Sequence, residues 1–150
     1  MFIKKGLLAA TILSVSCSTA LFAHEHHQDE MCGETKLHGY MMDIKNELRA
    51  MSSDIKSGDN SAAAERIDSL IASLEQSRNE TPYQLKAEKL KGEALATQQK
   101  EYVRIIDGTI DVFKNLEQAL LSGDSAGIKK WLGEMGSQRQ QGHGAFKANC

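Results

Sequence analysis

The sequence is poor in proline and in aromatic residues. It contains one proline in 150 residues, and aromatic side chains make up 5% of it. That supply is too small for a typical all-β core, whereas helix-favouring residues such as alanine, leucine, lysine and glutamate are plentiful. The length suits a single domain. We therefore expect an all-α fold.

A surplus of basic charge is also missing. The chain has 18 basic and 20 acidic residues, which gives a formal net charge of −2. Proteins that bind nucleic acid carry a basic patch that contacts the phosphates. We expect no nucleic-acid partner.

No apolar run reaches the ~20 residues that a membrane-spanning helix needs. Residues 1–23 begin with Lys4 and Lys5, continue with an apolar run from Gly6 to Val15, and end in small residues. This order predicts a secretory signal peptide that is cleaved after Ala23. The mature protein would then lie in the periplasm, with no membrane attachment.

Three other interpretations of this segment stay open. They are cleavage after Ala20, retention as a membrane anchor, and a lipoprotein attached at Cys17. The short apolar run disfavours the anchor, and Ser14 disfavours the lipoprotein because it stands where such a signal has leucine. Cleavage after Ala23 removes two lysines and no acidic residue, so the mature net charge would be −4.

Cysteine is scarce, and its placement is informative. Of three cysteines, Cys32 and Cys150 would remain after cleavage, one at each end of the folded part. Two such cysteines in an oxidising compartment predict one disulfide. Two free thiols are the alternative.

Residues 24–34 contain the segment HEHHQDE, which is polar and has no periodicity. We predict a flexible tail here. After cleavage His26 would be the third residue, a position that can chelate Cu(II) or Ni(II) together with backbone nitrogens. A solvated tail is the favoured interpretation.

Residues 35–150 show the pattern of an antiparallel four-helix bundle. Two copies of Ser-Gly-Asp, at 57–59 and 122–124, provide a left-handed glycine and the next N-cap. Short connections place neighbouring helices antiparallel, so the predicted topology is up-down-up-down. The apolar positions of the first helix are separated by 4, 3, 4, 3 and 4 residues, as in helix bundles: Leu37, Met41, Ile44, Leu48, Met51 and Ile55.

Three further helices are expected. The second stops before Pro82, residues 79–93 form the longest connection, and the third and fourth cover about 94–121 and 125–148. The expected core positions of the second and third helices are Ala63, Ile67, Leu70, Ile71 and Leu74, then Leu95, Tyr102, Ile106, Ile110, Phe113, Leu116 and Leu120. The fourth helix presents Ile128, Leu132, Met135, Arg139, Gly142 and Phe146 on its seam.

Two candidate ligands should lie at one end of this bundle. Met41 is on the apolar stripe near the start of the first helix, whereas Met42 is not. His143 is near the end of the fourth helix, between Gly142 and Gly144. Glycine is costly inside a helix, so this pair indicates either the close approach of a bulky planar group or a fraying last turn.

The same segments resemble a known family. Met41-Met42-Asp43-Ile44-Lys45-Asn46-Glu47-Leu48 and Arg139-Gln140-Gln141-Gly142-His143 are similar to the corresponding parts of soluble cytochrome b562. The interval from Gly123 to His143 keeps the family's register without a gap, and the resemblance covers residues 37–147. Cytochrome b562 is itself an up-down-up-down bundle.

The resemblance implies one non-covalent b-type haem, with Met41 and His143 as axial ligands of the iron. A thioether and an imidazole fill both axial positions, which suits electron transfer. It further implies that Arg139 pairs with a haem propionate and that Ile44 and Phe146 contact the haem. The alternatives are an ordinary surface arginine at 139 and core residues at 44 and 146 that need no haem. No Cys-x-x-Cys-His motif is present for covalent attachment.

We therefore expect a periplasmic electron-transfer protein that is monomeric and has an unidentified periplasmic redox partner. A haem-free bundle that binds a metal or a partner protein is the alternative. The sequence shows no nucleophile next to a base, so we do not expect an enzyme. His38, three residues before Met41, is an alternative axial ligand.

Overall fold

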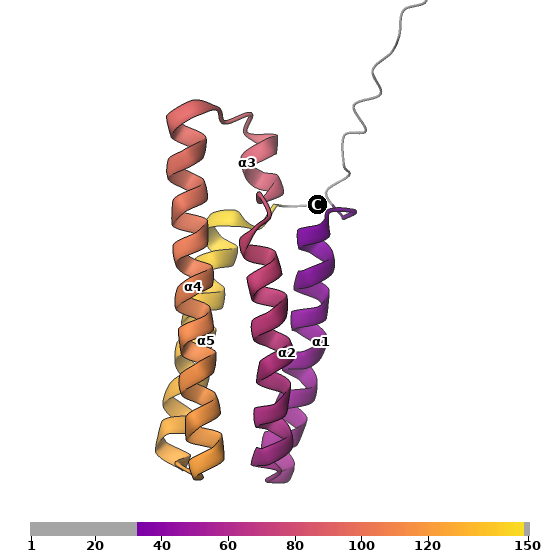
Figure 1. The fold of residues 1–150 in the computed structure, drawn as a ribbon, viewed down its shortest axis with the longest axis vertical. Coiled ribbons are helices and arrows are strands. Elements are labelled where there is room, and N and C mark those ends of the chain that lie inside the picture. The colour runs from indigo at the N-terminus through magenta and orange to yellow at the C-terminus, as the bar shows by residue number, and fades with distance from the viewer. Residues whose placement is uncertain (1–32, 149–150) are drawn as a thin grey trace, which may run out of the picture.

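The computed structural model describes residues 33–148. The predicted signal peptide, the histidine-rich segment 24–30 and both predicted disulfide partners, Cys32 and Cys150, lie outside these residues. The described chain is an all-α four-helix bundle, as the sequence predicts (Figure 1). Among its helices, none is long and apolar enough to cross a lipid bilayer.

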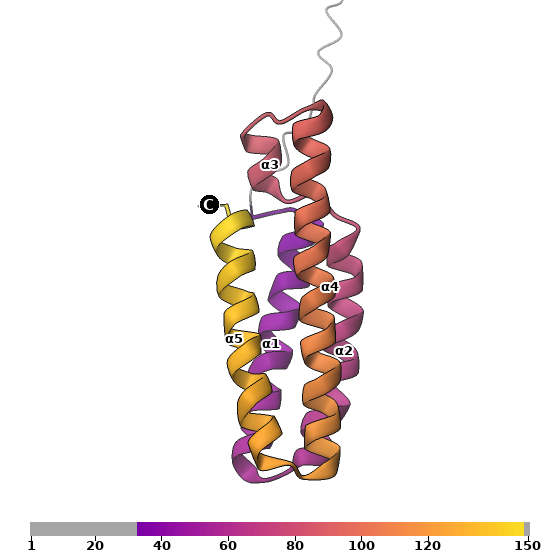
Figure 2. The ribbon, with the colours of Figure 1, turned by 90° about the vertical axis from the view of Figure 1, so that its left-hand side faces the viewer.

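Four long helices run antiparallel along the bundle, and a short fifth helix lies at one end (Figures 1 and 2). Helix α1 begins and α5 ends at the end of the bundle where α3 lies. The elements are α1 (Lys36–Ser57), α2 (Asn60–Arg78), α3 (Tyr83–Ala87), α4 (Gly92–Ser122) and α5 (Ser125–Phe146).

Both predicted Ser-Gly-Asp turns close a helical hairpin. Gly58 and Gly123 adopt the left-handed conformation, with φ of 80° and 67°, in which a side chain would be strained. Asp59 then accepts a hydrogen bond from the amide of Ala62, and Asp124 caps α5 in the same way. The two turns are therefore equivalent in structure as well as in sequence.

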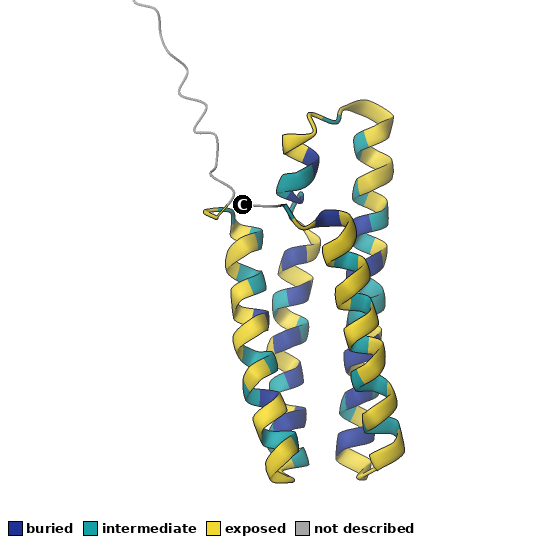
Figure 3. Ribbon diagram, turned by 180° about the vertical axis from the view of Figure 1, so that it is seen from behind, coloured by how far each residue is buried: buried dark blue, intermediate teal, exposed yellow. Residues whose placement is uncertain are grey.

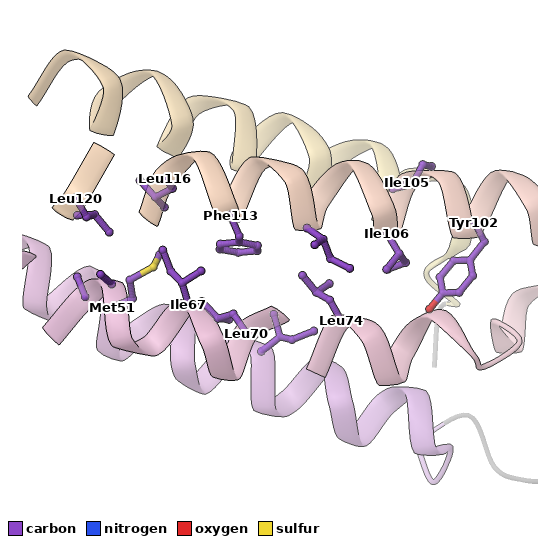
Figure 4. Packing of buried hydrophobic residues seen from close by; sticks show 14 of the residues in the cluster. Met51, Ile67, Leu70, Leu74, Tyr102, Ile105, Ile106, Phe113, Leu116 and Leu120 are labelled. Carbon is purple, nitrogen blue, oxygen red and sulfur yellow. The ribbon is translucent and has the colours of Figure 1, made fainter. Parts of the chain in front are cut away.

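The hydrophobic core lies mainly between α2 and α4. Figure 4 shows Phe113, Leu116 and Leu120 of α4 facing Ile67, Leu70 and Leu74 of α2, with Met51 of α1 beside them. Each of these side chains is at least 96% buried. Burying a side chain of this size stabilises the fold by roughly 1.5–3 kcal/mol, so this contact between α2 and α4 is the centre of the bundle.

The expected connection over 79–93 is more ordered than the sequence suggests. It contains α3, whose Leu85 is 2% exposed, and α4 begins at Gly92, two residues earlier than predicted. The sequence did not predict this short helix. Pro82 precedes α3 and is buried, which explains how so short a helix keeps its place.

Tyr102 of α4 forms a hydrogen bond that holds the start of this connection against the core. Its hydroxyl donates a hydrogen bond of 2.8 Å to the carbonyl oxygen of Ser77, near the end of α2. Burial, and then the charge of Glu80, raise the pKa of Tyr102 far above its ordinary value. The hydroxyl therefore stays protonated and remains a donor.

We predict that Tyr102→Phe lowers the free energy of unfolding by about 1–2 kcal/mol, because the buried Ser77 carbonyl loses its donor. Urea unfolding of the purified chain, followed by circular dichroism, measures this. Tyr83→Phe is the control, since the described residues give its hydroxyl no hydrogen bond. Equal stability of the two variants would contradict the prediction.

Candidate functional site

The side of the bundle between α1 and α5 is the least tightly packed. Close backbone contacts join α1 to α2, α2 to α4 and α4 to α5, but no comparable contact joins α1 to α5 within the described residues. In Figure 3 buried residues are frequent on α2 and α4 and sparse on α5. In the described chain, α5 fully buries Phe146 alone, whereas α4 fully buries nine side chains. We call the side between α1 and α5 the open seam.

Met41 lies on the flank of α1 that is turned away from α2. Glu47 and Asp54 mark the opposite flank, because both carboxylates contact Arg66 of α2. At ~100° per residue, Met41 is about 120° around the helix from Glu47. Its side chain is half-buried and packs against the core, whereas the neighbouring Met42 is exposed.

His143 lies on the flank of α5 that is turned away from α4. Gln138 and Gly142 mark the flank towards α4, where they pack beside Gly108 and Ile105. His143 follows Gly142 directly and is therefore ~100° further around the helix. The residue is exposed and lies in the last turn of α5, at the end of the bundle where α1 begins.

Phe146 shows which way His143 turns. It is buried, and its ring meets the ring of Tyr102 edge to face, with centroids 5.5 Å apart. Viewed along the axis of α5, with ~100° per residue, Gly142 lies on one side of Phe146 and His143 lies on the other. Since Gly142 faces α4, His143 lies on the flank towards the open seam.

The structure shows a reason for glycine at position 142 that was not expected from the sequence. A Cβ atom there would lie 3.3 Å from Cγ2 of Ile105, so the glycine allows α4 and α5 to approach closely. The last turn of α5 is also formed through Phe146, so it does not fray. A Cβ atom at Gly144 would meet no atom within 4 Å in the described structure.

The electrostatic surroundings of His143 favour its neutral form. Its pKa is lowered below the ordinary value, first by partial loss of water around the ring and then by the positive charges of Arg139 and Lys147. A neutral imidazole keeps a nitrogen lone pair that can bind a metal. Arg139, one turn before His143, is exposed.

Ile44 and several apolar residues line the inner side of the seam. Ile44 is 8% exposed and lies next to Met41 on the stripe. Trp131, which the periodicity did not select, also packs against the core from α5; its spacing of three residues from Ile128 was the available signal. The partly buried residues of α1 and α5 in this region are Leu37, Leu48, Ile128, Trp131, Leu132 and Met135.

His38 lies further from the core than Met41. It is exposed in the first turn of α1, and its amide donates to the side chain of Thr35, the N-cap. No three His, Cys, Asp or Glu side chains gather into a metal-binding group among residues 33–148. The described chain therefore offers Met41 and His143, rather than a carboxylate cluster, as candidate ligands.

Comparison with known proteins identifies a family and agrees with the fold. The sequence profile of one family, cytochrome b562, matches residues 36–147, from the start of α1 to the end of α5. Neither the curated proteins nor the solved structures give a match. The match covers most of the chain and all four long helices, and its family carries haem and transfers electrons. The chain belongs to the cytochrome b562 family.

Proposed function

We propose that the protein is a periplasmic electron carrier that holds one non-covalent b-type haem, with Met41 and His143 as axial ligands. Membership of the family supports haem binding and electron transfer. Family membership alone does not establish the ligand pair, the haem type, the single site or the location. The observation that carries the proposal is the open seam, which has a thioether on one flank and an imidazole on the other.

The residues of the seam fit such a group. A porphyrin is a large apolar disc with two carboxylates, so it needs apolar walls and a cation near the rim. Ile44 and Phe146 supply buried apolar surface near the two ligands, and the half-buried residues of α1 and α5 extend it. Exposed Arg139 lies one turn before His143 and supplies the cation for a propionate.

The proposed ligand pair determines the chemistry. A haem ligated by methionine and histidine has no open axial position, so it exchanges single electrons and does not bind oxygen. Met41 would raise the reduction potential, since a soft thioether favours the reduced iron. The role of the chain is to bind the group, keep water away from it and supply both ligands from rigid helices.

The remaining parts of the proposal concern the setting. The signal-peptide pattern of residues 1–23 supports export to the periplasm. We propose a monomer that exchanges electrons with a periplasmic redox partner, and not an enzyme. The haem-free alternative rests on the histidine-rich segment 24–30, which lies outside the described residues, so no structural observation favours it.

Haemin titration of the haem-free protein tests this function. We predict one equivalent bound, a Soret band, and a sharp α-band after reduction by dithionite. The single tryptophan, Trp131, packs against the core from α5, so its fluorescence should be quenched as haemin binds. A chain that takes up no haemin would contradict the proposal.

Met41→Ala should remove one axial ligand and convert the spectrum from low spin to high or mixed spin. Met42→Ala is the matched control: Met42 is 39% exposed and adjacent in sequence, so its loss should leave the spectrum unchanged. Absorption spectra of both oxidation states measure the effect. A spectral change in the Met42 variant alone would show that the ligand register on α1 is wrong.

His143→Gly should abolish low-spin ligation, and free imidazole at millimolar concentration should restore it by entering the vacated space. His38→Gly is the control for the alternative ligand, because His38 lies on the same end of the bundle. Spectra recorded with and without imidazole distinguish His143 from His38 as the ligand. If only the His38 variant loses the low-spin spectrum, His143 is not the ligand.

A further inference from the structure

From Lys45 onwards, the charges of α1 are sorted onto two sides of the helix; Lys36, in the first turn, lies ~20° from Glu47 and is the exception. Both Glu47 and Asp54 contact Arg66 of α2, so these two carboxylates face α2 and are paired. Lys45 and Arg49 each stand two residues from Glu47 and are therefore ~200° around the helix from it. Both are exposed, and neither forms an ion pair with another described residue.

Lys56 repeats this relation further along α1. It stands two residues after Asp54, so it also lies on the side away from α2, and it is exposed. The basic side of α1 thus extends from the turn after Met41 to the end of the helix. Asp43 is the remaining acidic residue of α1, and it lies about 40° from Glu47, on the side towards α2.

Helix α5 is sorted in a similar way, except that Lys130 lies ~40° from Glu134 and over the ring of Trp131. Its acidic residue, Glu134, is one turn before Gln138 and so lies on the flank towards α4. Lys129 is nine residues before Gln138, about 180° around the helix. Arg139 and Lys147 lie one turn before and one turn after His143, on the side of the open seam.

The opposite side of the bundle, formed by α2 and α4, is acidic. Its arginines are paired with carboxylates: Arg78 with Asp107 at 2.6 Å, and Arg104 with Glu101. Acidic residues outnumber basic ones on these two helices, and they are Glu65, Asp68, Glu75, Glu93, Glu101, Asp107, Asp111 and Glu117. An acidic chain therefore carries an unpaired basic strip along its open seam.

We infer that this basic strip, formed by Lys45, Arg49, Lys56 and Lys129 with Lys147, is the docking surface for an acidic partner protein. The inference rests on the proposed function, because the strip borders the seam in which the haem would lie. Opposite charge attracts the partner to this side, and the acidic α2–α4 side repels it, so encounters occur with the redox site facing the partner.

An acidic protein fits this strip better than an anionic membrane does. A helix that binds a membrane surface inserts an exposed apolar face. The large apolar side chains exposed among the described residues are Met42 and Leu121, on different helices. A flat basic strip without an apolar face matches a carboxylate-rich protein surface.

The sign of a salt effect tests the inference. The reduced haem protein gives one electron to ferricyanide, a small anion that stands in for the acidic partner, and ferrocyanide is formed. The rate constant is followed by stopped flow as the α-band disappears. If the basic strip guides the anion, the rate falls by about tenfold as sodium chloride is raised. If only the negative net charge acts, the rate rises with salt, which would overturn the inference.

A pair of double variants locates the effect. Lys45→Gln with Arg49→Gln should abolish most of the salt dependence. The control, Lys100→Gln with Lys114→Gln, removes the same charge from α4, seven residues on either side of Asp107, which faces α2. The control should keep the salt dependence of the wild-type rate constant. Equal losses in the two variants would contradict a local docking surface.

Two further measurements separate this inference from the proposed function. If the protein binds no haem, the proposed function fails, and the strip is then tested by nuclear magnetic resonance with a synthetic glutamate-rich peptide. Shifts confined to Lys45, Arg49, Lys56 and Lys129 support the docking surface; shifts spread over α2 and α4, or none, overturn it. Cosedimentation with phosphatidylglycerol vesicles, but no shift with the peptide, would assign the strip to a membrane instead.

Discussion

The packing of α2 against α4 is the contact on which the rest of this bundle depends. Fully buried residues such as Ile67, Leu70, Phe113 and Leu116 meet there, and α1 and α5 are each held against one member of this pair. Because the central pair holds the core, α1 and α5 do not have to close tightly on one another. In the function proposed above, an apolar prosthetic group would lie in this open seam and add to the core.

Much of the fold follows from the sequence alone. The spacing from Leu37 to Ile55 predicts α1, and the two Ser-Gly-Asp turns predict both hairpins, because helical periodicity and left-handed glycine are local properties. Helix α3 was not predicted, since five residues are too few to show a period. Its position depends on Pro82 and Leu85 being buried by distant helices, which is a tertiary effect.

The candidate site, like the fold, could be predicted from the sequence only in part. The sequence brings Met41 and His143 to one end through topology, and the resemblance to the family supplies their role. The reason for Gly142 could not be found from sequence, because it depends on Ile105 of another helix. Arg139 lies on the expected flank and is exposed, because a seven-residue spacing identifies a flank of a helix but not the depth at which its side chains lie.

The helices that border the seam are the first and the last of the described chain. A ligand held by both would link two segments separated by about a hundred residues of intervening chain, and would act on folding as a cross-link between the chain's ends. Its release would require only that a terminal helix move, while the central pair keeps its packing. Exchange of a group held in this way and global unfolding would therefore be separable events, and local opening at the termini would govern the first.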